Sequence, residues 1–267
     1  MFVPSLKSET WGTRTRPNDR RTKLLAMAGH EIRHPLELTR EAILATAKDP
    51  HLITLRLALA KFTSEQFHQM GRLLHLTGHI IGEDRTTGAS PFGHGSDEIV
   101  AISVLLRIAS QLVSASADLF MDGRSYAAAA LLRQMVEIEY LAWAFETRDR
   151  DAERWLRSNE QDRQDFFKPS KLRKASQGRF RGKDYGYHCE LGGHPVPKAT
   201  ILLADDLAIS QLLLSDLLGH VGRIWDHLVG WAKLNNEEVI LTRIPEMSSK
   251  FGEWLSKDIL VDLPPPP

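Results

Sequence analysis

In two long stretches near the N-terminus, mainly apolar residues recur at alternating steps of three and four positions. In the first stretch, about 21–48, the series is Leu25, Gly29, Ile32, Leu36, Thr39, Ile43 and Thr46. In the second, about 51–82, it is Leu52, Leu55, Leu59, Phe62, Gln66, Gln69, Leu73, Leu76 and Ile80. This alternation is the heptad pattern of coiled coils, in which one seam of each helix faces a partner. It predicts two long helices, the first with a weaker seam because of its Gly and Thr positions.

The two stretches are separated only by "KDPH", and Pro50 can end one helix and start the next. Two seamed helices joined by a short turn predict an antiparallel hairpin. A lone hairpin buries only one stripe per helix, so we expect it to pair with a second copy as a four-helix homodimer. The alternative is that the hairpin packs on the rest of its own chain.

The rest of the chain also has helical patterns, and we predict an all-α fold. A Gly-, Ser-, Thr- and Pro-rich stretch near 84–96 is the best domain boundary. The expected organisation is an irregular N-terminus at 1–20, a helical hairpin at 21–90, a helical bundle at 97–235 with a basic, Gly-rich excursion at 168–197, and a short helix with a Pro-rich tail at 236–267. "EEVILTR" is an isolated candidate strand.

Composition narrows the class of protein and its location. Lys and Arg number 34 and Asp and Glu number 34, so bulk charge indicates neither a nucleic acid nor a membrane partner. The single cysteine, Cys189, fits a reducing cytoplasm, and the N-terminus has no apolar core of signal-peptide length. The most apolar run, 126–145, carries Arg133, Glu137 and Glu139 and therefore reads as a buried helix rather than a membrane span.

The stretch "KLLAMAGHEIRHPLE" supplies the candidate catalytic residues His30, Glu31 and His34. H-E-x-x-H on a helix can bind zinc, with the glutamate as general base. Pro35 disfavours helical geometry at His34, and the motif has no third ligand at a known spacing. We therefore expect no metal and no other cofactor, although a zinc site at this motif stays an alternative.

The same stretch resembles the H-box of sensor histidine kinases, an apolar run followed by His-Glu-aliphatic-basic-x-Pro. "FHQMGRLLHLTGHIIGEDRTTG", residues 67–88, resembles the second helix of that family's dimerisation and phosphoacceptor domain. The resemblance covers about 21–90 and implies that His30 accepts phosphate while Glu31 takes or steadies its proton. His34 stands where the family often has Asn or Thr, which puts phosphatase activity in doubt.

Residues 91–267 show none of the ATP-binding boxes of that family and no P-loop. We therefore expect a phosphoacceptor-like protein that cannot phosphorylate itself. Phosphate would come from a partner kinase or response regulator, or the domain would only dimerise as a non-enzymatic scaffold.

Residues 97–235 resemble, more loosely, an uncharacterised bacterial helical family. The likeness lies in "AAALLRQMVEIEYLAWAF", "RWLRSNEQDRQDFFKPSKLRK" and "YGYHCELGGHPVP", and it implies a fold but no activity. Arg133 and Glu137 lie four apart on one helix face and can pair. The candidate second site adds four groups that follow a Gly-rich loop: Tyr187, His188, Glu190 and His194. The alternative is a polar network that fixes this loop to the bundle.

Residues 163–183 hold eight Lys or Arg against one Asp, with aromatic residues among them. Such a segment can neutralise phosphates and stack bases, so it is a candidate RNA-binding surface. Its candidate contacts are Lys171, Arg173, Lys174, Arg179, Arg181 and Lys183. Arg181 and His188 also resemble the Arg-x-His signature of HEPN-type RNases, although Gly182 stands where a polar residue is usual. A solvated basic loop is the alternative.

Overall fold

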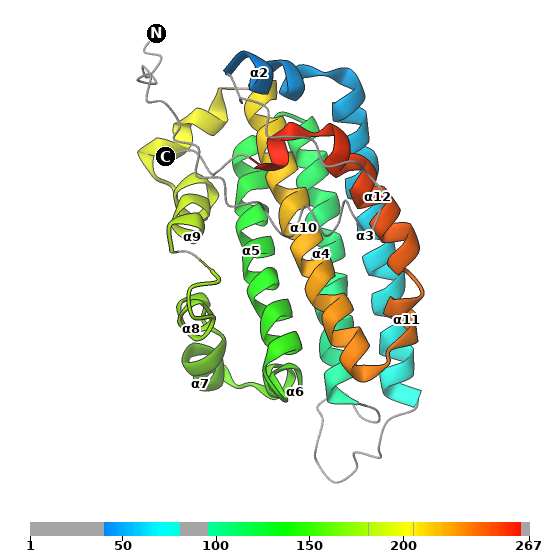
Figure 1. Ribbon diagram of the computed structural model, residues 1–267. Coiled ribbons are helices and arrows are strands. Elements are labelled where there is room, and N and C mark those ends of the chain that lie inside the picture. Colours follow the sequence, from blue (N-terminus) through cyan, green and yellow to red (C-terminus); the bar gives the residue numbers. More distant parts are fainter. Residues whose placement is uncertain (1–39, 81–95, 181, 205, 263–267) are drawn as a thin grey trace.

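The computed structural model describes residues 40–80, 96–180, 182–204 and 206–262, and every element in these ranges is helical, which confirms the all-α prediction (Figure 1). The longer helices are α2 (Arg40–Lys48), α3 (Pro50–Ile80), α4 (Asp97–Met121), α5 (Ser125–Thr147), α10 (Leu207–Asn235) and α12 (Ile244–Lys257). The shorter elements are α6 (Asp151–Arg157), α7 (Glu160–Asp162), η1 (Arg163–Phe167), α8 (Pro169–Ala175), α9 (Gly182–His188), η2 (Cys189–Gly193), η3 (Pro197–Leu203), α11 (Glu238–Leu241) and η4 (Ile259–Asp262).

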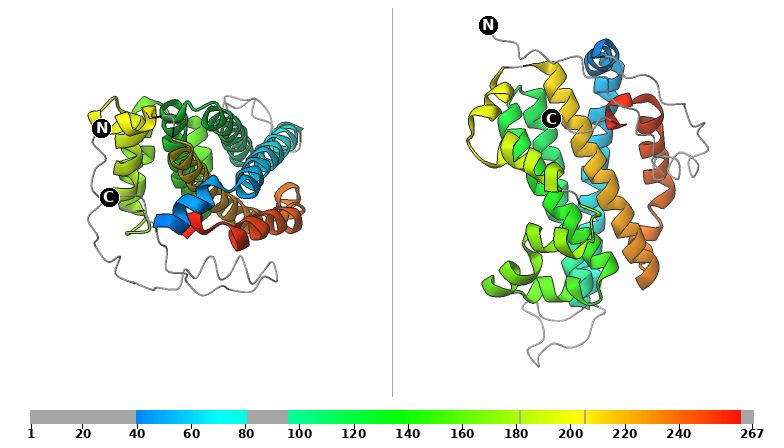
Figure 2. Two further views of the ribbon diagram at one scale, coloured as in Figure 1. Left: turned by 90° about the horizontal axis from the view of Figure 1, so that it is seen from above. Right: turned by 60° about the vertical axis from the view of Figure 1, so that its left-hand side comes forward.

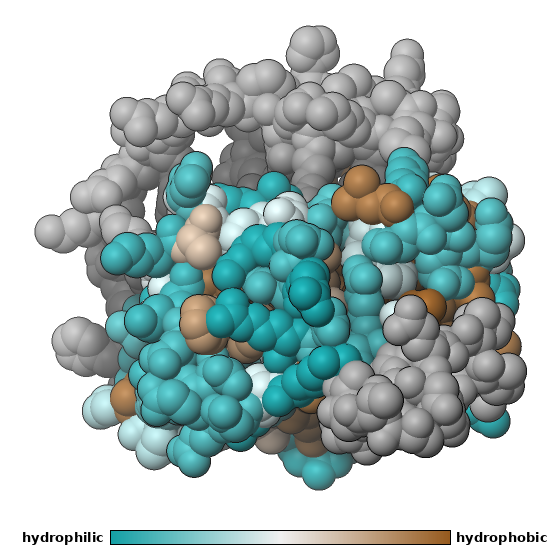
Figure 3. Space-filling view, turned by 90° about the horizontal axis from the view of Figure 1, so that it is seen from below, coloured by the Kyte–Doolittle hydropathy of each residue, from teal (hydrophilic) through white to brown (hydrophobic). Residues whose placement is uncertain are grey.

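The long helices α3, α4, α5, α10 and α12 lie side by side around one hydrophobic core (Figures 1 and 2). Phe67, Phe120 and Trp231 are among the largest fully buried side chains of that core. Helix α4 is long and apolar enough to cross a membrane, yet 61% of its most apolar window is buried inside the bundle. This burial is typical of a core helix of a globular domain. Seen from below, the described surface is mainly hydrophilic, with scattered apolar side chains (Figure 3).

The buried stripe of α3 follows a different register from the expected seam. Leu52, Leu59 and Gln66 are buried as expected, but Leu73 is 45% exposed. The buried positions among the described side chains of α3 are Leu52, Arg56, Leu59, Ala60, Thr63, Gln66, Phe67, Met70, Gly71 and Leu74. The stripe is shifted because α3 packs against α4 on one side and against α10 and α12 on the other, and because Arg56 turns inward to bind Asp258. The apolar stripe of α3 is thus used within its own chain, and pairing with a second copy stays a prediction.

Helix α2 does not lie alongside α3 as the expected hairpin requires. It crosses the end of the bundle and packs against α10 and η4 as well as α3 (Figure 1). The reason is a small apolar cluster in which Ile43, Leu44 and Ala47 contact Ala208 and Leu260. The expected hairpin is therefore wrong for the described part of its first helix. The remainder of that helix lies outside the described residues.

A long crossover segment, residues 148–206, joins α5 to α10. Its length follows from topology, because α5 and α10 run in the same direction and the chain must return along the bundle before α10 begins (Figure 1). The basic, Gly-rich excursion predicted at 168–197 contains the short helical elements α8, α9 and η2, and η3 begins at its end. The candidate strand "EEVILTR" is also wrong, since α11 is helical.

Gly192 brings the crossover segment into contact with the backbone of α5. A Cβ atom at Gly192 would lie 2.4 Å from the carbonyl carbon of Ala129 and 2.4 Å from the amide nitrogen of Ala130. Neither backbone atom can move without moving the helix, so only glycine fits this approach.

Gly192→Ala is therefore expected to lower the free energy of unfolding by about 1–3 kcal/mol, the usual cost of an overpacked contact. Urea unfolding measures this change. Gly186→Ala is the matched control, because a Cβ atom there would meet nothing within 4 Å. If both variants are equally stable, the close contact between the crossover segment and α5 is not formed in solution.

A buried polar network joins α2, α3, α10 and α12. The Arg56 side chain bonds Asp258 through two nitrogens, with Nε at 2.6 Å from Oδ2 and Nη2 at 2.9 Å from Oδ1, and both side chains are fully buried. Arg56 also donates to Gln211 Oε1 and to the carbonyl oxygen of Thr46. Trp254 Nε1 donates to Asp258 Oδ2 at 2.7 Å. The ion pair is thus surrounded by hydrogen-bond partners, as a buried charge requires.

Candidate metal centre

Helices α5 and α10 share two histidine–carboxylate pairs, spaced seven residues apart on both helices. His220 Nδ1 lies 2.6 Å from Glu139 Oε2, and His227 Nδ1 forms a short contact with Glu146 Oε2. The equal spacing arises because the two helices run parallel, so that a heptad on one matches a heptad on the other. In each pair the carboxylate fixes one ring nitrogen and directs the other, Nε2, toward the crossover segment.

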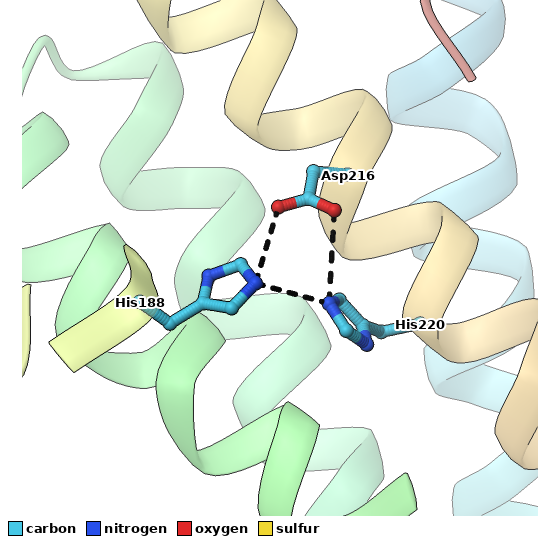
Figure 4. A group of neighbouring side chains, drawn as sticks. All are labelled: His188, Asp216 and His220. Atoms are coloured by element: carbon cyan, nitrogen blue, oxygen red, sulfur yellow. Dashed lines mark hydrogen bonds and ion pairs between the residues drawn. The ribbon is translucent and has the colours of Figure 1, made fainter. Parts of the chain in front are cut away.

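At the first pair, Nε2 of His220 meets His188 and Asp216 (Figure 4). The two Nε2 atoms lie 3.3 Å apart, and each lies 3.6 Å from one carboxylate oxygen of Asp216. Asp216 and His220 are four residues apart on α10, so their side chains lie on one face of that helix. His188 is the last residue of α9 and comes from the crossover segment.

These atoms have the spacing of metal ligands. An ion at the centre of the two nitrogens and two oxygens would lie roughly 2–2.5 Å from each, close to zinc bond lengths of about 2.0–2.2 Å. Two imidazole nitrogens 3.3 Å apart also need a shared proton or a cation between them, because two lone pairs repel each other. The donor set of two imidazoles and one carboxylate suits zinc or another divalent first-row metal.

The electrostatics keep the imidazole of His188 ready to bind a cation. Its side chain is 5% exposed, and burial lowers its pKa to about 4, so the ring is neutral at pH 7. Glu139 is buried, which alone would raise its pKa, but Arg223 and His220 hold that pKa well below its usual range. Glu139 is therefore ionised and can accept a hydrogen bond from Nδ1 of His220.

The tautomer of His220 follows from its neighbours. Arg223 Nε donates to both oxygens of Glu139 at 2.9 Å, and Arg223 Nη2 lies 2.6 Å from His220 Nδ1. Nδ1 cannot both donate to a carboxylate and accept from a guanidinium. Because Glu139 is ionised, we assign a proton to Nδ1; in the neutral form of the ring the lone pair is then on Nε2, which faces Asp216 and His188. A carboxylate behind a ligating histidine is the usual support of a metal site.

In the second pair, His227 with Glu146, the other ring nitrogen has a different partner. Nε2 of His227 faces Arg179 Nη2 at 3.3 Å. A guanidinium is a fixed cation, so it occupies the place that a metal would take. Of the two matched pairs, only that of His220 presents an open nitrogen to further ligands, and His227 becomes a natural control for it.

The structure separates the predicted second-site residues into three groups. Arg133 and Glu137 form the expected ion pair at 2.8 Å, but the group that joins them is Tyr185. Its hydroxyl accepts from Arg133 Nη2 and donates to Glu137 Oε1, both at 2.9 Å, and burial is the main reason that its pKa rises to about 12. Tyr187 contacts His188 edge to face, 5.2 Å between ring centres. His188 therefore belongs to the cluster with Asp216 and His220, and Tyr187 lies beside it rather than at the Arg133–Glu137 pair.

The other two predicted second-site residues lie at the surface. Glu190 pairs with Lys198 at 2.9 Å, and both side chains are half exposed. His194 is exposed. The prediction that all these groups meet in one pocket is therefore wrong, because η2 turns Glu190 and His194 outward while it keeps His188 inward.

The candidate RNA-binding residues are divided in the same way. Lys171 and Lys174 are exposed and line a shallow cavity of about 380 Å³ with Arg148 and Phe166. Arg173 stacks on the Tyr185 ring at 4.5 Å, and Arg179 contacts His227, so both bind within the chain. Arg181 and the side chain of Lys183 lie outside the described residues, and RNA binding stays a prediction.

The predicted phosphoacceptor residues His30, Glu31 and His34 also lie outside the described residues. Their role, and the alternative zinc site at that motif, stay predictions.

Comparison of this chain with protein-family models, with curated proteins and with solved structures gives no match. The case for a function therefore depends on the geometry of the site.

The sequence pattern indicates His188 but not its neighbours Asp216 and His220, nor Glu139 behind His220. Asp216 and His220 carry a weak signal, a four-residue spacing on a helix that is otherwise strongly apolar. A buried histidine and a buried glutamate on two apolar helices also indicate that the two must meet. Neither signal shows that His188 comes to the same place, because the route of the crossover segment is a tertiary property.

Proposed function

We propose that the protein is a metal-dependent enzyme with one zinc-type ion bound by His188, Asp216 and His220, and that the ion activates water for hydrolysis. The observation that supports this most is the convergence of two imidazoles and a carboxylate at ligand spacing, with Glu139 behind His220. Structural zinc sites use four protein ligands, whereas catalytic sites use three and keep a position for water.

The site has the features of an open centre. Among the described residues, the cluster of potential ligands contains three members. The two histidines are almost fully buried, but the Asp216 side chain is 35% exposed, so the cluster borders solvent on the Asp216 side. A zinc-bound water has a pKa of about 7, which supplies hydroxide at neutral pH. An ion held by His188, Asp216 and His220 would supply this hydroxide for attack on an ester carbonyl carbon, and the leaving oxygen would depart with the electron pair of the broken C–O bond.

The test compares chelator-treated and zinc-loaded protein. We expect one equivalent of zinc by mass spectrometry after dialysis, and faster hydrolysis of p-nitrophenyl acetate by the loaded protein. His194→Ala controls for binding by an exposed histidine and is expected to keep both properties. Zinc that is lost in His194→Ala, or a hydrolysis rate that is the same with and without zinc, contradicts the proposal.

The carboxylate behind His220 gives a second prediction. Glu139→Gln removes the charge that favours the Nδ1–H tautomer and is expected to weaken zinc binding about 10- to 100-fold, the usual effect of losing such a group. Glu146→Gln makes the same change at the matched pair, one heptad along, and is expected to leave zinc affinity unchanged. Isothermal titration calorimetry on both variants checks this. Equal losses would mean that the effect is general destabilisation.

Phosphate acceptance on His30 stays a separate proposal. A cytoplasmic location and a homodimer are proposed together with it. It predicts acid-labile phosphate that is lost in His30→Gln when a partner kinase and ATP are supplied. This experiment is independent of the metal centre.

A further inference from the structure

The crossover segment is held to the bundle by buried apolar side chains, among them Leu172, Leu191 and Leu202, and by the close approach of Gly192 to α5. Polar and aromatic contacts add to this attachment: Arg179 with His227, Phe180 on Tyr140 and Trp143, Tyr185 with Arg133 and Glu137, and His188 with Asp216 and His220. The Arg133 and Glu137 side chains are 28% and 31% exposed, so part of this attachment is solvated.

The helices of the segment cannot hold themselves together. Helices α6, α8 and α9 have seven residues each and α7 has three. Isolated helices this short are unstable in water, so their order depends on contact with α5 and α10. Segments of this kind open locally at a lower free energy than the core.

The three candidate ligands are divided between two parts of the fold. Asp216 and His220 lie on α10, which is part of the core, whereas His188 is carried by the crossover segment (Figure 4). When the segment opens, His188 leaves with it, and α10 keeps two ligands. The closed and open forms therefore differ in their affinity for the ion, which is the condition for a ligand to shift an equilibrium.

We propose that metal binding and closure of the crossover segment are coupled, so that the ion fixes the segment to α10 and the other contacts of the segment set the affinity for the ion. This regulation rests on the proposed metal centre. The coupling is reciprocal, because both effects measure the same free-energy difference. At a free zinc concentration of 100 times Kd, openings that release the ion become about 100-fold rarer.

Hydrogen–deuterium exchange tests the coupling, with zinc affinity measured by calorimetry on the same sample. We expect zinc to slow exchange in peptides from 169–203 by about 100-fold at 100 times Kd, where local opening governs exchange. Peptides from α11, on the other side of the bundle, serve as the internal control. His188→Ala is expected to remove the zinc effect, and His194→Ala, an exposed histidine of the same segment, is expected to keep it.

Tyr185→Phe tests the reciprocal direction. It removes the hydroxyl between Arg133 and Glu137 and touches no candidate ligand. We expect exchange of the segment in metal-free protein to rise about 10-fold, because hydrogen bonds to charged groups are lost, and zinc to slow it again. Zinc that binds without slowing the segment overturns the coupling and leaves the metal centre intact. If no zinc binds, the metal centre itself is wrong, and the coupling with it.

Discussion

Replacing Asp258 by alanine is expected to lower the free energy of unfolding by about 3–5 kcal/mol, because it leaves Arg56 charged, buried and unpaired. Both side chains are fully buried, and Asp258 accepts from Arg56, from Trp254 Nε1 and from the backbone amide of Leu260. The loss is therefore of several charge-assisted hydrogen bonds at once. Urea unfolding followed by circular dichroism measures it.

Two controls show whether the charge or the packing is responsible. Glu253→Ala breaks the surface pair with Lys257 on the same helix, where the side chains are 43% and 42% exposed, and is expected to cost less than about 1 kcal/mol. The double variant Arg56→Met/Asp258→Leu removes both charges and is expected to be more stable than Asp258→Ala alone. A double variant as unstable as the single variant would contradict the explanation by an unpaired charge.

The same pair shows why the sequence predicts the helices better than their arrangement. The start of α3 at Pro50 and the cap of α4 at Ser96 follow from local chemistry, and the structure has both. The register of the buried stripe of α3 does not follow from local chemistry, because Arg56 is buried only through its pairing with Asp258, 202 residues away. No pattern within α3 shows that a charged residue belongs to its inner face.

In the candidate site, too, local features could be predicted from the sequence and tertiary contacts could not. Arg133 and Glu137 pair as predicted because four-residue spacing on a helix is a local property. Two further contacts depend on the path of the crossover segment and on the close approach that Gly192 allows. They are the hydrogen bond of Tyr185 to that pair and the contact of His188 with α10. A single sequence shows that the segment is basic and aromatic but not where each of its residues comes to lie.

The matched histidines of α10 provide the most direct experiment on the metal centre. His220 and His227 are almost equally buried, at 5% and 2% exposure, and each bonds a glutamate of α5 through Nδ1. They differ in what Nε2 meets, which is Asp216 and His188 in one case and Arg179 in the other. Replacing either by alanine should therefore cost similar stability.

Their effects on metal binding should differ greatly. Zinc sites with four ligands bind with apparent free energies of about 10–16 kcal/mol, or about 2.5–4 kcal/mol per ligand. His220→Ala is thus expected to weaken zinc binding by about that free energy, which corresponds to roughly 60- to 800-fold. His227→Ala, which leaves all three ligands in place, is expected to bind zinc as the wild type does. Calorimetric titration separates the two results, and equal zinc affinities in the two variants would show that Nε2 of His220 binds no metal.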